Sequence, residues 1–175
     1  MAIIKKLNGH TPKFGKNCFL ADNAAIIGDV EMGNDCSIWF GAVLRGDVHS
    51  IRIGNKVNIQ DNATIHATYK KSPTNIGNNV SIAHNAVIHG CTIKDNVLIG
   101  MGAIVLNGAK IGSDCIVGAG ALVTGKMDAP DGSMILGSPA KVVRPLKPEE
   151  IEGNRAAMEE YLEAAAQYRK EQEAR

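Results

Sequence analysis

The sequence predicts a mainly β protein, a triangular parallel β-helix followed by one α-helix. A branched or other large apolar residue recurs every six positions through most of the 175 residues. Glycine and β-branched residues are frequent in each segment, which disfavours helix, whereas the last segment has apolar residues at helical spacing. We therefore expect residues 1–145 to form the β-helix and residues 146–175 to form a helix packed on it.

The hexapeptides explain how the chain folds into a prism. If three of them make one turn, six coils share one core and are stabilised by contacts between neighbouring coils. The residue that opens each hexapeptide fills the interior, and a small residue in fifth place lies beside it. Gly or Asn between them lets the backbone turn a corner. The openers are Phe14, Leu20, Ile26, Met32, Ile38, Leu44, Ile53, Ile59, Ile65, Ile76, Ile82, Ile88, Ile93, Ile99, Val105, Ile111, Val117 and Val123.

The repeat is interrupted at three places. Three extra residues separate Leu44 from Ile53, a loop of five extra residues precedes Ile76, and the step from Ile88 to Ile93 is one residue short. Departures from an otherwise regular pattern are expected where a functional site imposes its own geometry. All three interruptions lie at or next to histidines, so we expect the site there.

A turn-rich exit is expected after Val123, followed by a helix from Pro148 to about Gln172. Proline in the first turn and acidic residues beside it are typical of a helix start. We expect Arg169 to Arg175 to be a solvated end. One face of the helix is predicted to pack along the prism through Ile151, Met158, Leu162 and Ala165.

Three histidines have the spacing of a metal site. His66 and His89 each directly follow an opener, and after the five inserted residues are removed they are 18 residues apart, which is one coil. They should stack on one face, with strands roughly 4.8 Å apart, and bind one metal ion. His84 lies on the preceding face and should reach that ion only from another subunit. Three nitrogen ligands with an open position are typical of catalytic zinc, although Fe(II) or cobalt can use the same ligands.

Polar residues extend the predicted site. Asn58, Gln60 and Asp61 surround one opener, and Asp61 should stack under His84 in the next coil. Gln60 can then hydrogen-bond a metal-bound water. The alternative for Asn58 and Asp61 is a ladder of turn residues. Arg45, in the three-residue insertion, can pair with a carboxylate across an interface.

The second member of that predicted pair is Asp47, two residues after Arg45. The alternative is an exposed ion pair of little energetic value. His10 and His49 are interpreted as ordinary surface or stacked residues. The four cysteines are interpreted as reduced packing residues, with Cys18 and Cys36 stacked in successive coils; no CxxC pair suggests a metal or redox motif.

Composition excludes several classes of function. A formal net charge of +1 gives no reason to expect binding to nucleic acid or to a membrane surface. No apolar run approaches the roughly 18 residues of a spanning helix, and the first residues lack a secretory signal. We therefore expect a cytoplasmic protein.

The chain resembles the γ-class carbonic anhydrases of the left-handed β-helix hexapeptide superfamily. The resemblance covers nearly the whole chain and rests on these motifs: Arg45-Gly-Asp47, Asn58-Ile-Gln-Asp-Asn62, Ile65-His66, His84-Asn-Ala-Val-Ile-His89-Gly90 and residues 137–143. It implies a left-handed solenoid and a homotrimer with metal ions at its interfaces. His66, His84 and His89 are then ligands, two from one subunit and one from the next.

The resemblance also implies an activity, the reversible hydration of CO2 to bicarbonate with metal-bound hydroxide as nucleophile. Gln60 would orient the hydroxide and Asn58 would position CO2. Arg45 would pair with Asp61 or Asp47 and contact bicarbonate, and Asn154 is similar to a family residue near the site.

Val48 and Tyr69 stand where the family's archetype has acidic residues, so we expect slow proton release, limited by buffer or by His49 or Tyr69. Two alternatives are an acyltransferase or thioesterase acting on a coenzyme A ester and a metal-stabilised trimeric scaffold without activity. The exit at residues 137–143 is similar to that of hexapeptide acyltransferases. Those enzymes generally use a single catalytic histidine.

Overall fold

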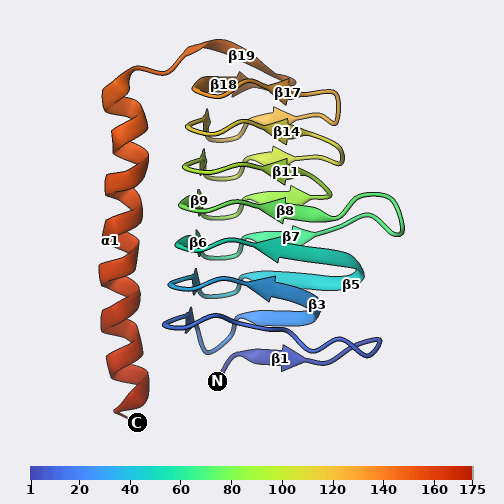
Figure 1. Cartoon of the computed structure of the whole chain (residues 1–175), viewed down its shortest axis with the longest axis vertical. Coiled ribbons are helices and arrows are strands. Elements are labelled where there is room, and N and C mark those ends of the chain that lie inside the picture. Colours follow the sequence, from blue (N-terminus) through green and yellow to red (C-terminus); the bar gives the residue numbers. More distant parts are fainter. Residues whose placement is uncertain (175) are drawn as a thin grey trace.

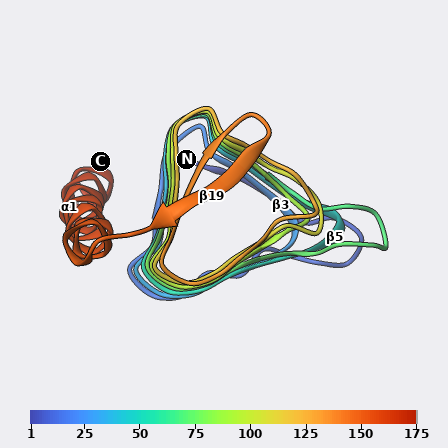
Figure 2. The same cartoon turned by 90° about the horizontal axis from the view of Figure 1, so that it is seen from above.

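The computed structural model describes residues 1–174 and shows a three-sided parallel β-solenoid of about seven turns. A single long helix runs along one side of the stack (Figure 1). Seen along the stack, the coils superpose as a triangle, and the helix lies against one edge (Figure 2). The predicted fold class is confirmed.

Short parallel strands form the three faces, and most strands pair with the strands one coil before and after them. Face 1 comprises β1 (Ile3–Lys5), the first parts of β3 (Ala25–Met32) and β5 (Val43–Ile53), β7 (Thr64–His66), β10 (Val87–His89), β13 (Ile104–Val105) and β16 (Leu122–Val123). Face 2 comprises the later parts of β3 and β5, then β8 (Thr74–Ile76), β11 (Thr92–Ile93), β14 (Lys110–Ile111) and β17 (Asp128–Ala129).

Face 3 comprises β2 (Phe19–Leu20), β4 (Ser37–Ile38), β6 (Val57–Ile59), β9 (Val80–Ile82), β12 (Leu98–Ile99), β15 (Ile116–Val117) and β18 (Ser133–Gly137). The antiparallel strand β19 (Ala140–Pro145) pairs with β18 at the end of the stack. β3 and β5 bend around the corner between faces 1 and 2, and loops project from that vertex, which lies opposite the helix (Figure 2).

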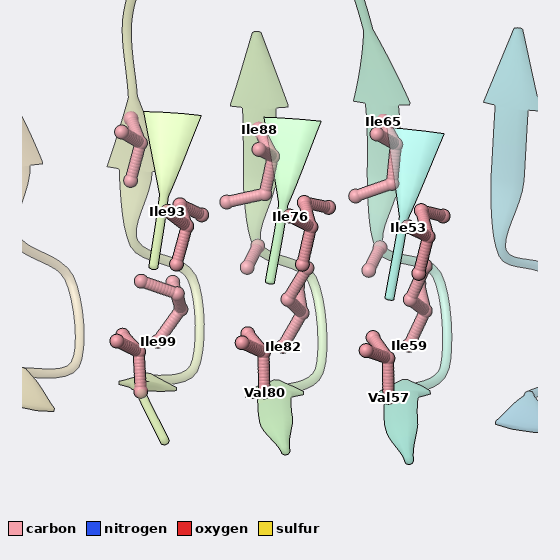
Figure 3. Close-up of a cluster of buried hydrophobic side chains, with 14 of the residues drawn as sticks. Ile53, Val57, Ile59, Ile65, Ile76, Val80, Ile82, Ile88, Ile93 and Ile99 are labelled. Carbon is pink, nitrogen blue, oxygen red and sulfur yellow. The ribbon is translucent and has the colours of Figure 1, made fainter. Parts of the chain in front are cut away.

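Stacked apolar side chains fill the prism. Ile59, Ile82 and Ile99 are fully buried and lie one above another in register. Further columns run in parallel, one through Ile53 and Ile76 (Figure 3). Burying one such side chain stabilises the fold by about 1.5–3 kcal/mol, so the repeat itself supplies the core.

The corners between faces require a left-handed backbone, and the sequence supplies residues that tolerate it. Asn62 and Asn85 turn the corner between faces 3 and 1 with φ of 59° and 60°. Asparagine adopts this conformation more readily than other non-glycine residues. At the corner between faces 2 and 3, side chains also bridge coils: Asn79 Nδ2 donates to Asn96 Oδ1 at 2.8 Å.

The solenoid continues with regular strand pairing after Val123, where the sequence predicted a turn-rich exit. β17 pairs with β14 and places Ala129 on Ile111, while β18 places Ile135 on Val117. Ala129 and Ile135 are 3% and 0% exposed, as interior positions should be. The sequence concealed this coil because alanine occupies an opener position and the surrounding residues are rich in turn formers.

Helix α1 (Pro148–Glu173) begins where the sequence predicted. Glu150 accepts a hydrogen bond from the backbone N–H of Lys147 at 2.8 Å and forms a bidentate ion pair with Arg144. Met158 and Ala165 are buried against face 3, as the predicted apolar face requires. Within residues 1–174 no helix is long and apolar enough to cross a membrane, and the cytoplasmic location stays a prediction.

The far end of α1 agrees with the solvated end predicted from Arg169 at Lys170, Glu171, Glu173 and Ala174, which are exposed, but not at Gln172, which contacts the prism. Tyr168 packs edge-on against Trp39, with ring centroids 5.3 Å apart. Gln172 Nε2 donates to the carbonyl oxygen of Leu20 at 3.0 Å. The last turns are thus held on the first coils by aromatic contacts that apolar spacing alone does not reveal; residue 175 lies outside the described residues.

The alternation of inward-facing and outward-facing side chains, which builds the core, can be tested at two neighbouring residues of β11. Ile93 is 1% exposed inside the prism, whereas Thr92 is exposed on face 2. We expect Ile93→Ala to lower the free energy of unfolding by about 2–5 kcal/mol because it leaves a cavity. Thr92→Ala should change it by less than about 0.5 kcal/mol. Urea unfolding of both variants checks this, and equal losses would contradict the assigned register.

Candidate functional site

His66 and His89 stand side by side at the ends of neighbouring strands of face 1. The register pairs them directly, as the spacing predicted. Their ring centroids are 4.9 Å apart and their planes are inclined by 67°. His66 Nδ1 lies 3.0 Å from His89 Nε2, so the two rings turn one nitrogen each toward the same point.

The outer nitrogens of this pair are held by oxygen acceptors. His66 Nε2 lies 2.8 Å from Asp47 Oδ1, and a carboxylate can only accept, so Nε2 carries the proton. His89 Nδ1 donates to the side-chain oxygen of Asn107. In the neutral rings, the inner nitrogens therefore present facing lone pairs 3.0 Å apart, which repel unless a cation lies between them.

A metal ion fits this arrangement. Two nitrogens bound to one tetrahedral zinc at 2.0–2.1 Å are about 3.4 Å apart, close to the separation seen here. Metal-bound histidines usually donate their other N–H to a carboxylate or carbonyl oxygen, which fixes the tautomer. Asp47 and Asn107 occupy those places. Asn107 was not among the residues predicted for the site, although it follows His89 by 18 residues and so belongs to the same column.

Asp47 comes from the three-residue insertion in β5. Burial opposes its ionisation, but hydrogen bonds from His66 and Arg45 outweigh this effect and hold its pKa below the usual value. The Arg45 guanidinium forms its ion pair with Asp47 inside the same chain, whereas the sequence suggested a pair across an interface. Arg45 thus anchors the carboxylate that orients His66.

Thr74, at the start of β8, connects the two histidine strands. Its side chain is fully buried, and its hydroxyl donates to the carbonyl oxygen of His66. The same hydroxyl accepts the N–H of Gly90, the residue after His89, at 2.9 Å. That Thr74 joins the two histidine strands could not be predicted, because a buried threonine after a loop has no distinguishing sequence pattern.

His84 lies at a different vertex, between faces 3 and 1. Its Nδ1 is 2.8 Å from Asp61 Oδ2, which confirms the predicted stacking of these two residues. Asp61 is itself fixed because its Oδ1 accepts the backbone N–H of Phe40 at 3.2 Å. The Nε2 of His84 is left as the nitrogen that can bind another group.

Asn58 and Gln60 lie on face 3 beneath α1, one coil before His84. Both are buried, and Gln60 Nε2 donates to Asn58 Oδ1 at 2.9 Å. Asn58 in turn donates to Ser81 Oγ at 2.8 Å and contacts Met158 Sδ at 3.5 Å. The helix and β9 therefore lock this amide pair in one orientation; neither Ser81 nor the contact with Met158 was anticipated.

Asn154, the helix residue expected near the site, instead holds α1 to the prism. Its side-chain amide donates to the backbone oxygens of Asn96 and Cys115, both at 3.2 Å. It is 5% exposed. These contacts account for its burial without a ligand.

The site residues thus form two separate groups. Arg45, Asp47, His66 and His89 lie at the vertex between faces 1 and 2, while Asn58, Gln60, Asp61 and His84 lie toward the vertex between faces 3 and 1. Five extended residues from His84 to His89 span up to about 16–18 Å. Among residues 1–174, no cluster of three His, Cys, Asp or Glu side chains can hold a metal ion.

Removal of the Thr74 hydroxyl tests how the histidine strands are joined. We expect Thr74→Val to lower the free energy of unfolding by about 0.5–1.5 kcal/mol, because the His66 carbonyl and the Gly90 N–H lose the hydroxyl and keep only their own hydrogen bond at 3.2 Å. Thr74→Ser keeps the hydroxyl and serves as the matched control. Denaturant unfolding measures both, and a Val variant as stable as the Ser variant would contradict this role.

Comparisons with known proteins agree with the predicted fold and with the family resemblance. The model described as "Bacterial transferase hexapeptide (six repeats)" matches residues 11–46 and 90–125. A carbonic anhydrase of Geobacillus kaustophilus is 40% identical over 99% of this chain and 94% of its own length. A hexapeptide transferase family protein from Anaplasma phagocytophilum has a TM-score of 0.91 and 37% identity, covering 95% of this chain and 98% of that one.

Gamma carbonic anhydrase 2, a mitochondrial protein of Arabidopsis thaliana, is 42% identical over 81% of this chain. The chain spans about half of that relative's length, 52%. The similarity to the Geobacillus protein, by contrast, extends over nearly the full length of both chains. On this similarity and the shared hexapeptide solenoid, the chain belongs to the γ-class carbonic anhydrase-like family of hexapeptide-repeat proteins.

Proposed function

We propose that the chain is a metal-dependent carbonic anhydrase that hydrates CO2 reversibly to bicarbonate. His66 and His89 of one copy and His84 of a second copy would hold zinc, or Fe(II) or cobalt. The observation that carries the proposal is the pair of facing nitrogens 3.0 Å apart, each on a ring whose other nitrogen is already held by an acceptor. The carbonic anhydrase relatives support the reaction.

The surface of face 1 supports assembly of several copies. Its outward positions form an in-register, mostly apolar ladder through Val43, Thr64, Val87, Ile104 and Leu122. The corresponding positions of face 2 are polar or charged, and α1 covers face 3. A contiguous exposed apolar surface typically marks a protein interface, so face 1 is the face that a second copy would cover.

The division of the histidines fixes the kind of interface. One vertex of each copy offers His66 and His89, and a different vertex offers His84, so the contact joins unlike surfaces. Contacts between unlike surfaces generate a closed ring when repeating the rotation from one copy to the next returns to the first copy. For a prism with a triangular section we propose a homotrimer with three equivalent metal sites.

A zinc-class ion bound to three histidines supplies an activated water at neutral pH. The residues of the chain have to hold the ion, orient CO2 and exclude bulk water. Asp47, Asn107 and Asp61 each fix one imidazole. Gln60, from the copy that supplies His84, would orient the activated water, and Asn58 would help to position CO2. The hydrogen bond between the two amides and the contact of Asn58 with Met158 Sδ keep them in place.

Proton release is the step for which the chain is least equipped. Val48 and Tyr69 replace acidic residues at the mouth of the predicted site. Tyr69 is 62% exposed on the loop after His66, with the Lys70 ammonium 5.1 Å from its ring centroid. His49 Nδ1 accepts the backbone N–H of Ser50 at 2.8 Å. We expect turnover limited by external buffer, with Tyr69 or His49 as the available relays.

A second candidate function is acyl transfer or thioester hydrolysis on a coenzyme A ester. The observations that favour it are the transferase hexapeptide model and the hexapeptide transferase family structure from Anaplasma. A metal-stabilised trimer without activity is the third.

Substitutions at His84 and Gln60 separate metal binding from catalysis. We expect the wild type to bind one metal ion per chain and to hydrate CO2, and His84→Ala to lose both, because one ligand of each site disappears. Gln60→Ala should keep the metal and lose about tenfold to hundredfold in rate. Elemental analysis and stopped-flow hydration measure these, with the exposed His10→Ala as matched control.

Bound metal without hydration at any buffer concentration would sink the proposed reaction. Thioesterase and acyltransferase assays on coenzyme A esters then decide between the two remaining candidates. Metal retained in His84→Ala would contradict the ligand set itself.

Mixed trimers test the shared site directly. In trimers assembled from His84→Ala chains and His89→Ala chains, one interface combines the intact His66 and His89 of the first with the intact His84 of the second. We therefore expect one metal site in each mixed trimer and none in either homotrimer. Native mass spectrometry after co-refolding counts the ions. Mixed trimers as empty as the homotrimers would exclude ligands from two copies.

A further inference from the structure

Cys18 and Cys36 form a thiol pair at the first two coils, away from the histidines. The strands that follow them are paired, Phe19 with Ser37, so the two cysteines are stacked neighbours. Neighbouring strands lie roughly 4.8 Å apart, within the 4.4–6.8 Å range of Cα separations in disulfides. The register confirms the predicted stacking of these two cysteines, and both are free thiols in the structure. That they are reduced in the cell stays a prediction.

The two sulfurs differ in access. Cys36 is 1% exposed inside the prism, whereas Cys18 is partly exposed. Cys18 lines a hollow of about 770 Å³ at the open N-terminal end of the stack, together with Leu20 and Arg169. A small oxidant can therefore reach Cys18 but not Cys36. Within residues 1–174 the other two cysteines are buried and have no thiol stacked beside them. Cys115 stacks between Val97 and Ser133, and Cys91 between Thr74 and Ala109.

Charge and hydrogen bonding favour ionisation of the exposed member. The side chain of Cys36 hydrogen-bonds Cys18 and lowers the pKa of the Cys18 thiol, against its own partial burial and the nearby Asp35; Arg169 also lowers it. As a neutral thiol, Cys18 donates to the carbonyl oxygen of Gly33 at 3.3 Å. Burial raises the pKa of Cys115. Reactive cysteines are those with an accessible thiolate, often beside a second thiol.

We propose that Cys18 and Cys36 are a peroxide-sensitive pair, in which Cys18 is oxidised first and Cys36 then closes a disulfide. The Cys18 thiolate attacks one oxygen of hydrogen peroxide, the O–O bond breaks, and hydroxide departs. The product is a sulfenic acid on Cys18. The Cys36 sulfur attacks that sulfur, the S–O bond breaks, and water leaves with the Cys36 proton. Two thiols are oxidised and one peroxide is reduced, and the disulfide joins the first two coils.

The sequence makes this product easy to detect. Trypsin releases both cysteines on one peptide, residues 17–45, because no Lys or Arg separates them. After treatment of the reduced full-length protein with hydrogen peroxide, we expect this peptide to be lighter by two hydrogen atoms. Cleavage after Glu31 should then leave two halves that separate only on reduction. A peroxide-treated peptide of unchanged mass would overturn the proposal.

Two variants separate the roles of the thiols. Cys36→Ala should accumulate a sulfenic acid on Cys18 that dimedone traps, whereas Cys18→Ala should leave Cys36 unmodified. In the column of Cys18 and Cys36 the other coils have valine, cysteine or serine, whereas Ala24, Ala42 and Ala63 occupy the corresponding buried place before the strands of face 1. Alanine is therefore tolerated at this place of the hexapeptide. Oxidation of Cys36 in the absence of Cys18 would contradict the proposed order.

Alkylation rates test whether the Cys18 thiol ionises more readily than the Cys115 thiol. With iodoacetamide at pH 7, we expect Cys18 in the folded protein to react at least about tenfold faster than Cys115. Arg169→Gln should slow the reaction of Cys18, whereas Lys170→Gln, the adjacent residue, should not. Equal rates at Cys18 and Cys115 would overturn the assignment of Cys18 as the reactive thiol.

Discussion

Parallel pairing between successive coils is the constraint on which the rest of the structure depends. Because each strand pairs with the strand one coil away, residues one coil apart lie directly above one another. That separation is 18 residues where the repeat is regular and 23 residues across the loop before β8. Like therefore stacks on like: isoleucine on isoleucine in the core and asparagine on asparagine at the corners. The same rule places His89 on His66 and His84 on Asp61. One register thus positions both the core and the candidate site.

The candidate site is built where the repeat is broken. The insertion in β5 adds Asp47, which reaches His66, and the loop before β8 precedes Thr74, which joins the two histidine strands. A regular prism has no room for these groups, because every position of a hexapeptide is already assigned to core, corner or outward surface. The insertion shifts the pairing of β3 with β5 between Gly28 and Val30, and regular pairing continues on both sides of the shift. The added side chains therefore leave the inward-facing columns in register.

The three faces have different surroundings. Helix α1 covers face 3 and holds Asn58 beneath Met158, and Asn58 in turn accepts a hydrogen bond from Gln60. Face 2 is polar, and face 1 carries an apolar ladder. In one chain the histidines are split between two vertices, so completion of the proposed site and covering of face 1 would be a single event. Metal binding and assembly should therefore depend on each other.

The sequence by itself determined the period, the inward-facing residues, the stacking of His66 on His89 and the start of α1, because these follow from spacing along the chain. It did not reveal the last coil, where Ala129 takes an opener's place, nor Asn107, Thr74 and Ser81. Those roles depend on contacts between side chains in different coils, and only the tertiary structure decides which nitrogen of each histidine an acceptor holds. His84 is separated from the other two histidines because the prism is triangular and His84 lies at a different vertex. The spacing of the repeat predicts this separation, and the packed prism shows it.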